Sequence, residues 1–364
     1  MKVLSVVGAR PNFMKVAPII RAMERHSHPF ESVLVHTGQH YDARMSDSFF
    51  ADLRMPEPDF NLEVGSGSHA AQTAAVMTRI EPVLQEVAPD LVLVVGDVNS
   101  TLAATITAKK LHLRVAHVEA GLRSFDMAMP EEINRLCTDV IADDLFTTDR
   151  MADENLRREG VAEGRIHFVG NVMIDSLMAS LPAARRLNQA DAFGLARRGY
   201  AVLTLHRPSN VDDPALLEQI MGAILDGVTE LPIVFPAHPR TADKLKSLAR
   251  LSGPGAERLR IVEPMGYLEF QSLVSDAGLV LTDSGGLQEE TTVLRVPCVT
   301  LRENTERPIT VEQGTNILAG VSRDGILRGI EAALATDPGA ARIPELWDGR
   351  TAERIVQTIA GWRN

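Results

Sequence analysis

Residues 91–97, Leu-Val-Leu-Val-Val-Gly-Asp, carry the pattern that decides the fold. Five consecutive apolar residues predict a strand buried on both faces, and the glycine and aspartate mark its end. Similar runs recur, separated by segments of helical length. They are 3–7, 32–35, 91–95 and 115–118, and then 201–205, 233–235, 259–262, 279–282 and 298–301. The chain is therefore predicted to be an α/β protein with two doubly wound parallel sheets.

The division between the two sheets is expected near residue 172. Residues 180–200 are rich in Ala and Arg and contain no clear strand, and a new series of strands begins after them. The predicted domains are 1–172 and 173–350. The last stretch, 351–364, is amphipathic and is expected to form a helix that packs back on the first domain.

Composition excludes several classes of protein. The 364 residues include 37 Lys and Arg against 48 Asp and Glu, a net charge of −11, which argues against a broad nucleic-acid surface but not against a small anionic ligand. Cys137 and Cys298 are the only cysteines, so neither a disulfide scaffold nor a thiolate zinc site is expected. No apolar run approaches the ~18 residues of a membrane span, and the first residues lack signal-peptide features, so a cytoplasmic location is expected.

Polar side chains follow nearly every predicted strand. Ligands of open parallel sheets bind beyond the carboxyl ends of the strands, so these side chains are expected to line a cleft between two facing sheets. The segments are 8–11 with Lys15, 36–40, 96–101, 119–123, 206–207, 238–240, 283–286 and 302–307.

The segment Ser284-Gly285-Gly286 gives the sharpest single signal. Its glycines allow close approach of a ligand, and the N–H groups of the following helix favour an anion. A simple capped turn, with Asp283 or Ser284 as the cap, explains the same residues about equally well. Glu290, one turn into the helix, is suited to accept hydrogen bonds from ribose hydroxyls. Arg307 is a candidate ligand for a second phosphate.

The acidic residues of the first half are candidate catalytic groups. Asp97 and Glu119 each follow a buried strand, where a carboxylate must be hydrated, paired or poised for chemistry. Glu131 and Glu132 open a predicted helix, which favourable charge at a helix N-terminus would also explain. Candidate partners are Arg123, Asn134 and Arg135. His206 is either a hydrogen-bonded strand-end residue or an acid or phosphate ligand beside Arg207.

Other cofactor signals are weak. Residues 65–70 match G-x-G-x-x-A, but no buried strand precedes them, so we interpret them as a mobile loop and do not expect NAD. There is no P-loop motif and no H-E-x-x-H. His36 and His40 have helical spacing, but Gly38 between them argues against a helix. No metal and no cofactor are predicted.

Taken together, these segments resemble the non-hydrolysing UDP-N-acetylglucosamine 2-epimerases. They follow the family order from residue 2 to about 320, and the ordered set is highly specific. The matching segments are Gly8–Pro11 with Lys15, Thr37–His40, Gly96-Asp97, His117–Arg123, Pro130–Arg135, His206-Arg207, Thr282–Glu290 and Thr305–Pro308.

The resemblance implies two Rossmann-like domains around a nucleotide-sugar cleft, as in the glycosyltransferase-B class, and a homodimer. It implies reversible conversion of UDP-N-acetylglucosamine (UDP-GlcNAc) to UDP-N-acetylmannosamine (UDP-ManNAc) without a cofactor. UDP is eliminated to give 2-acetamidoglucal and is then added back. The product would serve a capsule, a lipopolysaccharide or another acetamido-sugar polymer.

The resemblance also implies roles for individual residues. The catalytic set matches Asp97, Glu119, Glu131 and His206. The diphosphate ligands match Arg10, His206, Ser284, Gly285, Gly286 and Arg307, with Glu290 on the ribose. Lys15 and Arg135 would neutralise or orient the acidic groups, and Met265 and Phe270 fall where the family contacts uracil.

Two departures from the family pattern matter. Pro208 and Ser209 stand where many bacterial members have Arg-Glu after His-Arg. Asp42 stands where allosterically controlled members have a second glutamine, so activation by UDP-GlcNAc at a second site is not expected.

Three alternatives remain open. The nearest is a 2-epimerase of UDP-2,3-diacetamido-2,3-dideoxyglucuronate, which looks similar around residues 36–42, 99–101 and 123–131. Residues 305–308 favour UDP-GlcNAc. A glycosyltransferase of the same fold would not need the acidic cluster, and an inactive nucleotide-sugar sensor would gain nothing from it.

Overall fold

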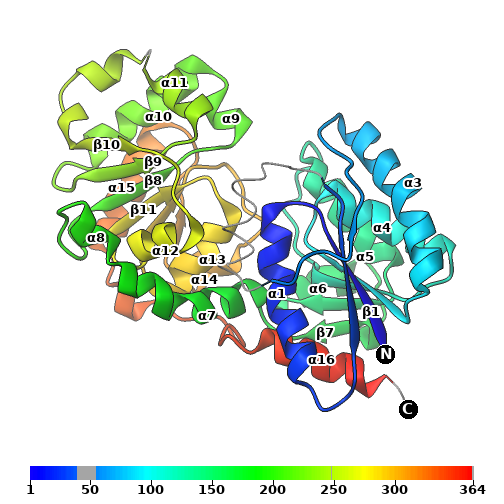
Figure 1. Cartoon of the computed structure of the whole chain (residues 1–364). Coiled ribbons are helices and arrows are strands. Elements are labelled where there is room, and N and C mark those ends of the chain that lie inside the picture. Colours follow the sequence, from blue (N-terminus) through cyan, green and yellow to red (C-terminus); the bar gives the residue numbers. More distant parts are fainter. Residues whose placement is uncertain (39–54, 247, 363–364) are drawn as a thin grey trace. The chain divides into compact units, whose positions relative to one another are not determined.

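The computed structural model describes residues 1–38, 55–246 and 248–362. The chain forms two compact units, Met1–Ala179 with Glu345–Asn364, and Ser180–Pro344. Each unit contains one sheet of parallel strands with helices around it (Figure 1). The predicted α/β class with two parallel sheets is confirmed.

Helix α7 (Val172–Leu187) runs from one unit into the other. The units divide inside this helix, after Ala179, whereas the sequence places the boundary at the helix's first residue. A continuous helix crosses the division, so no loop marks it in the sequence.

The first sheet has the order β3-β2-β1-β4-β5-β6-β7. Its strands are β1 (Lys2–Val7), β2 (Glu31–His36), β3 (Phe60–Asn61), β4 (Leu91–Val95), β5 (Val115–Ala120), β6 (Asp144–Thr147) and β7 (Ile166–Phe168). Its helices are α1 (Arg10–Arg25), α3 (His69–Val87), α4 (Asn99–Lys110), α5 (Pro130–Ile141), α6 (Arg150–Arg158) and α16 (Thr351–Gly361).

The second sheet has the order β10-β9-β8-β11-β12-β13. Its strands are β8 (Ala201–Thr204), β9 (Ile233–Pro236), β10 (Leu259–Val262), β11 (Leu279–Thr282), β12 (Cys298–Thr300) and β13 (Asn316–Leu318). The helices of this unit are α8 (Gln189–Ala192), α9 (Pro208–Val211), α10 (Pro214–Gly227), α11 (Pro239–Leu245), α12 (Tyr267–Ser275), α13 (Gly285–Leu294), α14 (Ile309–Glu312) and α15 (Arg323–Ala335).

Alternate residues of the central strands enter different cores. In the second unit, Leu203 and Leu281 belong to one apolar cluster, and Val202 and Val280 belong to another. Side chains of a strand point alternately to its two faces, so a sheet covered by helices on both faces requires apolar residues throughout. This is why runs such as 279–282 carry no polar alternation.

The C-terminal segment packs within the first unit, where α16 lies beside α1 (Figure 1). The Asp175 carboxylate accepts hydrogen bonds from the backbone N–H groups of Thr351 (3.1 Å) and Ala352 (2.7 Å) at the start of α16. The indole N–H of the buried Trp347 donates to the Thr148 carbonyl at 2.9 Å.

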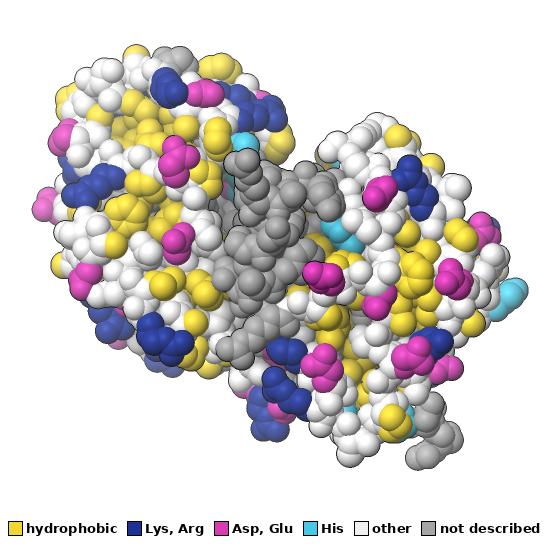
Figure 2. Space-filling model, viewed as in Figure 1, with side chains coloured by type: hydrophobic (Ala, Val, Ile, Leu, Met, Phe, Trp, Pro, Cys, Tyr) yellow, Lys and Arg dark blue, Asp and Glu magenta, His cyan; other side chains and the backbone are white. Residues whose placement is uncertain are grey.

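The surface matches the acidic composition. On the face shown in Figure 2, acidic and basic side chains are interspersed rather than gathered in a stripe of one sign. Among the helices in the described ranges, none combines the length and the apolar character needed to cross a membrane.

Candidate active site

The order of strands along each sheet reverses at one place, and candidate residues gather there. The parallel neighbours are β1 and β4 in the first sheet and β8 and β11 in the second. Such a reversal leaves a crevice beyond the carboxyl ends of two adjacent strands, where ligands of this architecture bind. Asp97 follows β4, and His206 follows β8.

Glu119 and Lys15 form a buried ion pair between Oε2 and Nζ, with side chains 4% and 6% exposed. Glu119 has φ +74° and lies where the pairing of β5 with β6 shifts register. A left-handed glutamate in a strand is strained, and bulges of this kind re-aim side chains beside functional sites. The two opposite charges compensate each other for the loss of water.

Lys15 also lies against the turn that carries Asp97. A Cβ atom built on Gly96, whose φ is +66°, would lie 2.9 Å from Lys15 Nζ. The glycine therefore serves both the left-handed turn and the close approach of the ammonium. The same turn is tied to the loop after β1, because the Asn12 side chain donates to the Val95 carbonyl at 3.0 Å and accepts from Ala9 N–H at 2.9 Å.

Arg135 joins two carboxylates on the same side of the first unit. Its guanidinium is buried and forms ion pairs with Asp97 Oδ2 and with Glu132. Glu132 also accepts from the N–H groups of Ser124 and Phe125, both at 2.9 Å. Burial alone would raise the pKa of Glu132, but the backbone donors and Arg135 hold it below its ordinary value.

The two glutamates at the start of α5 differ sharply, although the sequence treats them alike. Glu132 is 1% exposed and is anchored as described, whereas Glu131 is half-buried. Consecutive helical residues point about 100° apart, so only one of them can face the core. Glu131 remains the carboxylate of this pair that is accessible to a ligand.

A buried network that the sequence did not single out supports the Asp97 turn. His117 on β5 is fully buried; its Nε2 is 2.8 Å from the Gly96 carbonyl and its Nδ1 is 2.7 Å from Asp139 Oδ1. Arg123 pairs with Asp139 at 2.8 Å. A histidine inside an apolar strand was the available signal, because such a ring must find partners when buried.

In the second unit, His206 contacts a fully buried carboxylate. Its Nδ1 lies 2.8 Å from Asp283 Oδ1, and 61% of the His206 side chain is exposed while Asp283 is 0% exposed. Asp283 follows β11, so the pair spans the two strands at the reversal.

The segment Ser284-Gly285-Gly286 starts α13, with Ser284 in the N-cap position. The Ser284 side chain makes no capping hydrogen bond, so the capped-turn explanation is not met by that residue. A Cβ on Gly285 would lie 2.6 Å from Glu306 Oε1 and 3.2 Å from Arg307 Nη1. A larger residue at the helix start would therefore displace the Glu306 and Arg307 side chains.

Arg307 is buried among carboxylates. Its Nε is 2.7 Å from Glu289 Oε1 and its Nη1 is 2.8 Å from Glu306 Oε1, while Arg302 pairs with the other Glu306 oxygen at 2.8 Å. Burial would raise the pKa of Glu306, but Arg307 and Arg302 keep it well below its ordinary value. Arg307 lies beside the start of α13, but its charge is already shared with two glutamates.

Glu290 is buried, and burial with the adjacent Glu289 raises its pKa to about 8. A buried carboxyl of this kind keeps its proton at neutral pH until a ligand supplies hydrogen-bond donors. Met265 and Phe270 are partly buried against the apolar cluster of the same unit.

Several predicted positions lie beyond what the structure describes. The side chain of Arg10 is outside the described part, although its backbone begins α1. His40 and Asp42 fall in 39–54, also outside it. Within the described ranges, no group of three His, Cys, Asp or Glu side chains is placed to hold a metal ion.

A family model described as UDP-N-acetylglucosamine 2-epimerase matches residues 21–360. The chain belongs to this family. The UDP-N-acetylglucosamine 2-epimerase of Methanocaldococcus jannaschii is 42% identical over 365 residues, with 99% of each chain covered. The UDP-2,3-diacetamido-2,3-dideoxy-D-glucuronate 2-epimerase of Pseudomonas aeruginosa is also 42% identical, over 368 residues and 99% of each chain.

Structural similarity agrees with this membership. The crystal structure of the M. jannaschii enzyme in complex with UDP-GlcNAc and UDP matches with a TM-score of 0.89 at 42% identity, covering 99% of this chain and 100% of that chain. The predictions of this epimerase family, of an isomerase and of a glycosyltransferase-B-like fold are confirmed.

Proposed function

We propose that this enzyme interconverts UDP-GlcNAc and UDP-ManNAc by inverting the configuration at C2. The observation that carries the proposal is the pair of carboxylates at the carboxyl edge of the first sheet, Asp97 and Glu119, each held by a buried cation. A protein that only binds an anionic nucleotide sugar gains nothing from carboxylates near it, whereas proton transfer at carbon requires a base and an acid.

The reaction proceeds through elimination. A carboxylate removes the C2 proton, and the C–H electron pair forms a C1=C2 double bond as the C1–O bond breaks. Its electrons leave with UDP, and 2-acetamidoglucal remains. UDP oxygen then adds to C1 while C2 receives a proton on the opposite face. Since the C2 proton is weakly acidic, stabilisation of the departing diphosphate must share the work.

The two units supply different parts of this chemistry. We assign Asp97, Glu119 and Glu131 to proton transfer, with Lys15 and Arg135 orienting the first two. The second unit is assigned to UDP. Its proposed ligands are His206, Ser284, Gly285, Gly286 and Arg307 for the diphosphate, Glu290 for the ribose and Met265 and Phe270 beside the uracil; the family resemblance adds Arg10 as a further candidate for the diphosphate.

A second substrate deserves a direct test, because the similar proteins at 42% identity include one named for UDP-2,3-diacetamido-2,3-dideoxy-D-glucuronate. Purified enzyme is incubated separately with each UDP-sugar, and the epimers are separated by anion-exchange chromatography. We expect UDP-GlcNAc to be converted to an equilibrium mixture at the higher kcat/KM. Turnover of only the diacetamido sugar would reassign the substrate and keep the chemistry.

We also propose that the enzyme lacks allosteric activation. Because Asp42 replaces the second glutamine of allosteric members, the rate is expected to rise hyperbolically with UDP-GlcNAc, and UDP-ManNAc is expected to react without added UDP-GlcNAc. Sigmoidal kinetics would contradict this. A homodimer and a role in acetamido-sugar polymer synthesis are proposed from the family resemblance, and a cytoplasmic location is proposed from the sequence features described above.

A further inference from the structure

We propose that Asp283 is a positioning residue that fixes His206 as its Nδ1–H tautomer and directs Nε2 toward the diphosphate of the bound nucleotide sugar. The inference rests on the proposed function and extends it to a residue with no assigned role. It explains why a fully buried aspartate lies beneath a histidine that is mostly exposed.

Asp283 is surrounded by hydrogen-bond donors. Its oxygens accept from the backbone N–H of His206 at 3.1 and 3.2 Å and of Arg207 at 2.9 Å, and from the Asn210 side chain at 3.2 Å. His206 Nδ1 approaches at 2.8 Å. An ionised carboxylate can only accept, so every group facing it must donate.

These donors indicate that Asp283 is ionised and that the His206 hydrogen facing it lies on Nδ1. Burial would raise the pKa of Asp283, but the His206 ring and the backbone donors hold it below its ordinary value. Asp283 is therefore a carboxylate, and the hydrogen on Nδ1 is the one it binds. Because 61% of the His206 side chain is exposed, the remaining nitrogen, Nε2, is available to a ligand.

The backbone links this pair to the start of α13. Asp283 directly precedes Ser284, the N-cap of that helix. The Arg207 side chain donates from Nε to the Asp283 carbonyl at 3.1 Å, which ties the β8 loop to the same turn. The N-terminus of a helix attracts anions. The contacts of Asp283 and Arg207 therefore hold His206 next to the start of α13, where an anion would bind.

We expect the His206–Asp283 pair to act as the C1–O bond breaks. The electrons of that bond pass to the β-phosphate, whose oxygens gain negative charge. When the ring takes up a second proton from solvent at Nε2 beside the diphosphate, this Nε2–H donates a hydrogen bond to a non-bridging oxygen, and Asp283 stabilises the imidazolium through Nδ1–H. The proton stays on Nε2 through elimination and re-addition of UDP, so the histidine has the same charge before and after the reaction.

The first measurement is the ¹⁵N spectrum of the full-length enzyme labelled at histidine nitrogens. The His206 signals are identified by their loss in His206→Gln. We expect a protonated Nδ1 at neutral pH, and a shift of the Nε2 signal on adding UDP that is absent in Asp283→Asn. An Nε2–H tautomer, or an Nε2 signal unaffected by UDP, would overturn the proposal whether or not the enzyme turns over UDP-GlcNAc.

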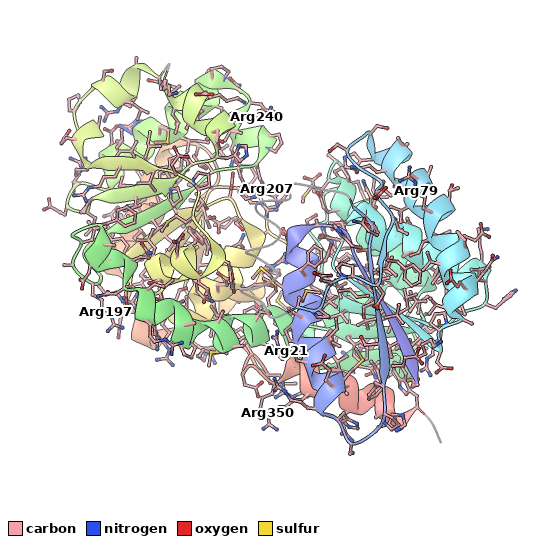
Figure 3. The ribbon with its side chains drawn as sticks, in the orientation of Figure 1. Arg21, Arg79, Arg197, Arg207, Arg240 and Arg350 are labelled. Atoms are coloured by element: carbon pink, nitrogen blue, oxygen red, sulfur yellow. The ribbon has the colours of Figure 1, made fainter. Side chains whose placement is uncertain are left out.

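The second measurement separates positioning from structure. Asp283→Asn should lower kcat on the order of a hundredfold or more, and Asp283→Asn with His206→Gln should be within about threefold of His206→Gln alone, because the aspartate acts through the histidine. Multiplicative losses would contradict this. The matched control is Asp276→Asn, whose partner Arg197 (2.9 Å) lies on a different side of this unit from Arg207 in Figure 3, and it should keep kcat unchanged.

Discussion

Lys15 Nζ and Glu119 Oε2 form an ion pair in which both side chains are almost fully buried. The cation comes from the first helix and the carboxylate from a strained position of β5. Two charges taken out of water are tolerated when they meet each other, and removing one of them leaves the other without compensation.

We predict that Lys15→Met abolishes activity and destabilises the first unit. An unpaired buried carboxylate costs about 3–5 kcal/mol, so the midpoint of denaturant unfolding should fall clearly. The double variant Lys15→Met/Glu119→Gln should recover most of the stability but no activity, because the carboxylate is then absent. A Lys15→Met enzyme with ordinary stability would refute the importance of this pair.

Glu290 should give the second unit a characteristic pH dependence. Its pKa is raised to about 8 from an ordinary value of 4.5. Between these values the unfolded chain is ionised while the folded carboxyl keeps its proton, so its contribution to stability is full below about 4.5 and is lost as pH rises toward 8. Glu290→Gln should flatten this slope and stabilise the protein by a few kcal/mol at neutral pH, as measured by urea unfolding from pH 5 to 8.

The same carboxyl should respond to UDP. If ribose hydroxyls donate to Glu290, binding favours its ionised form and releases a proton near neutral pH. Calorimetric titration of UDP in buffers of different ionisation enthalpy measures this release. Wild type should release protons and Glu290→Gln should not. Equal proton release in both would remove Glu290 from the UDP site.

Gly285→Ala should weaken UDP binding. The added methyl would meet Glu306 Oε1 at 2.6 Å and Arg307 Nη1 at 3.2 Å, so the buried ion pairs beside the helix start must move. We expect a loss of about tenfold or more in UDP affinity, equivalent to about 1.4 kcal/mol, in fluorescence or calorimetric titrations. Gly164→Ala, which would meet nothing within 4 Å, is the matched control and should bind UDP normally.

Docking of the C-terminal helix should depend on Asp175. The chain has two tryptophans, Trp347 and Trp362, and both lie in the segment that returns to the first unit. Asp175→Ala removes the acceptor for two N–H groups at the start of α16 and should cost about 1 kcal/mol or more. Tryptophan emission should shift to the red at lower urea concentration than in wild type. An unchanged midpoint would show that the cap is dispensable.

The strands with long apolar runs were predictable because burial on both faces leaves no room for polar residues. The central strands 91–95 and 279–282 match β4 and β11 in both bounds. The edge strands β3, β7 and β13 escaped prediction because they are short and only partly buried. Strand β6 was also missed, since Asp144 at its start breaks the apolar run; its carboxylate is satisfied by Arg114 at 2.8 Å.

The sequence could nominate candidate site residues but not the contacts between them. Sequence could place Asp97 and Glu119 after buried strands, but which cation meets which carboxylate depends on α1 and α5 packing beside them. Glu132 and Asp283 looked like ordinary helix and turn residues. Their importance comes from burial, which requires partners; those of Glu132 are local, Ser124, Phe125 and Arg135, whereas those of Asp283 lie 73 to 77 residues away.

The most direct test of the proposed chemistry is proton NMR of the purified enzyme with UDP-GlcNAc in deuterated water. We predict that UDP-ManNAc appears with deuterium in place of the C2 proton, and that Asp97→Asn and Glu119→Gln slow this exchange by about 10²-fold or more. A folded enzyme that binds UDP but produces neither exchange nor epimer, or that produces an epimer retaining its C2 proton, would contradict the account.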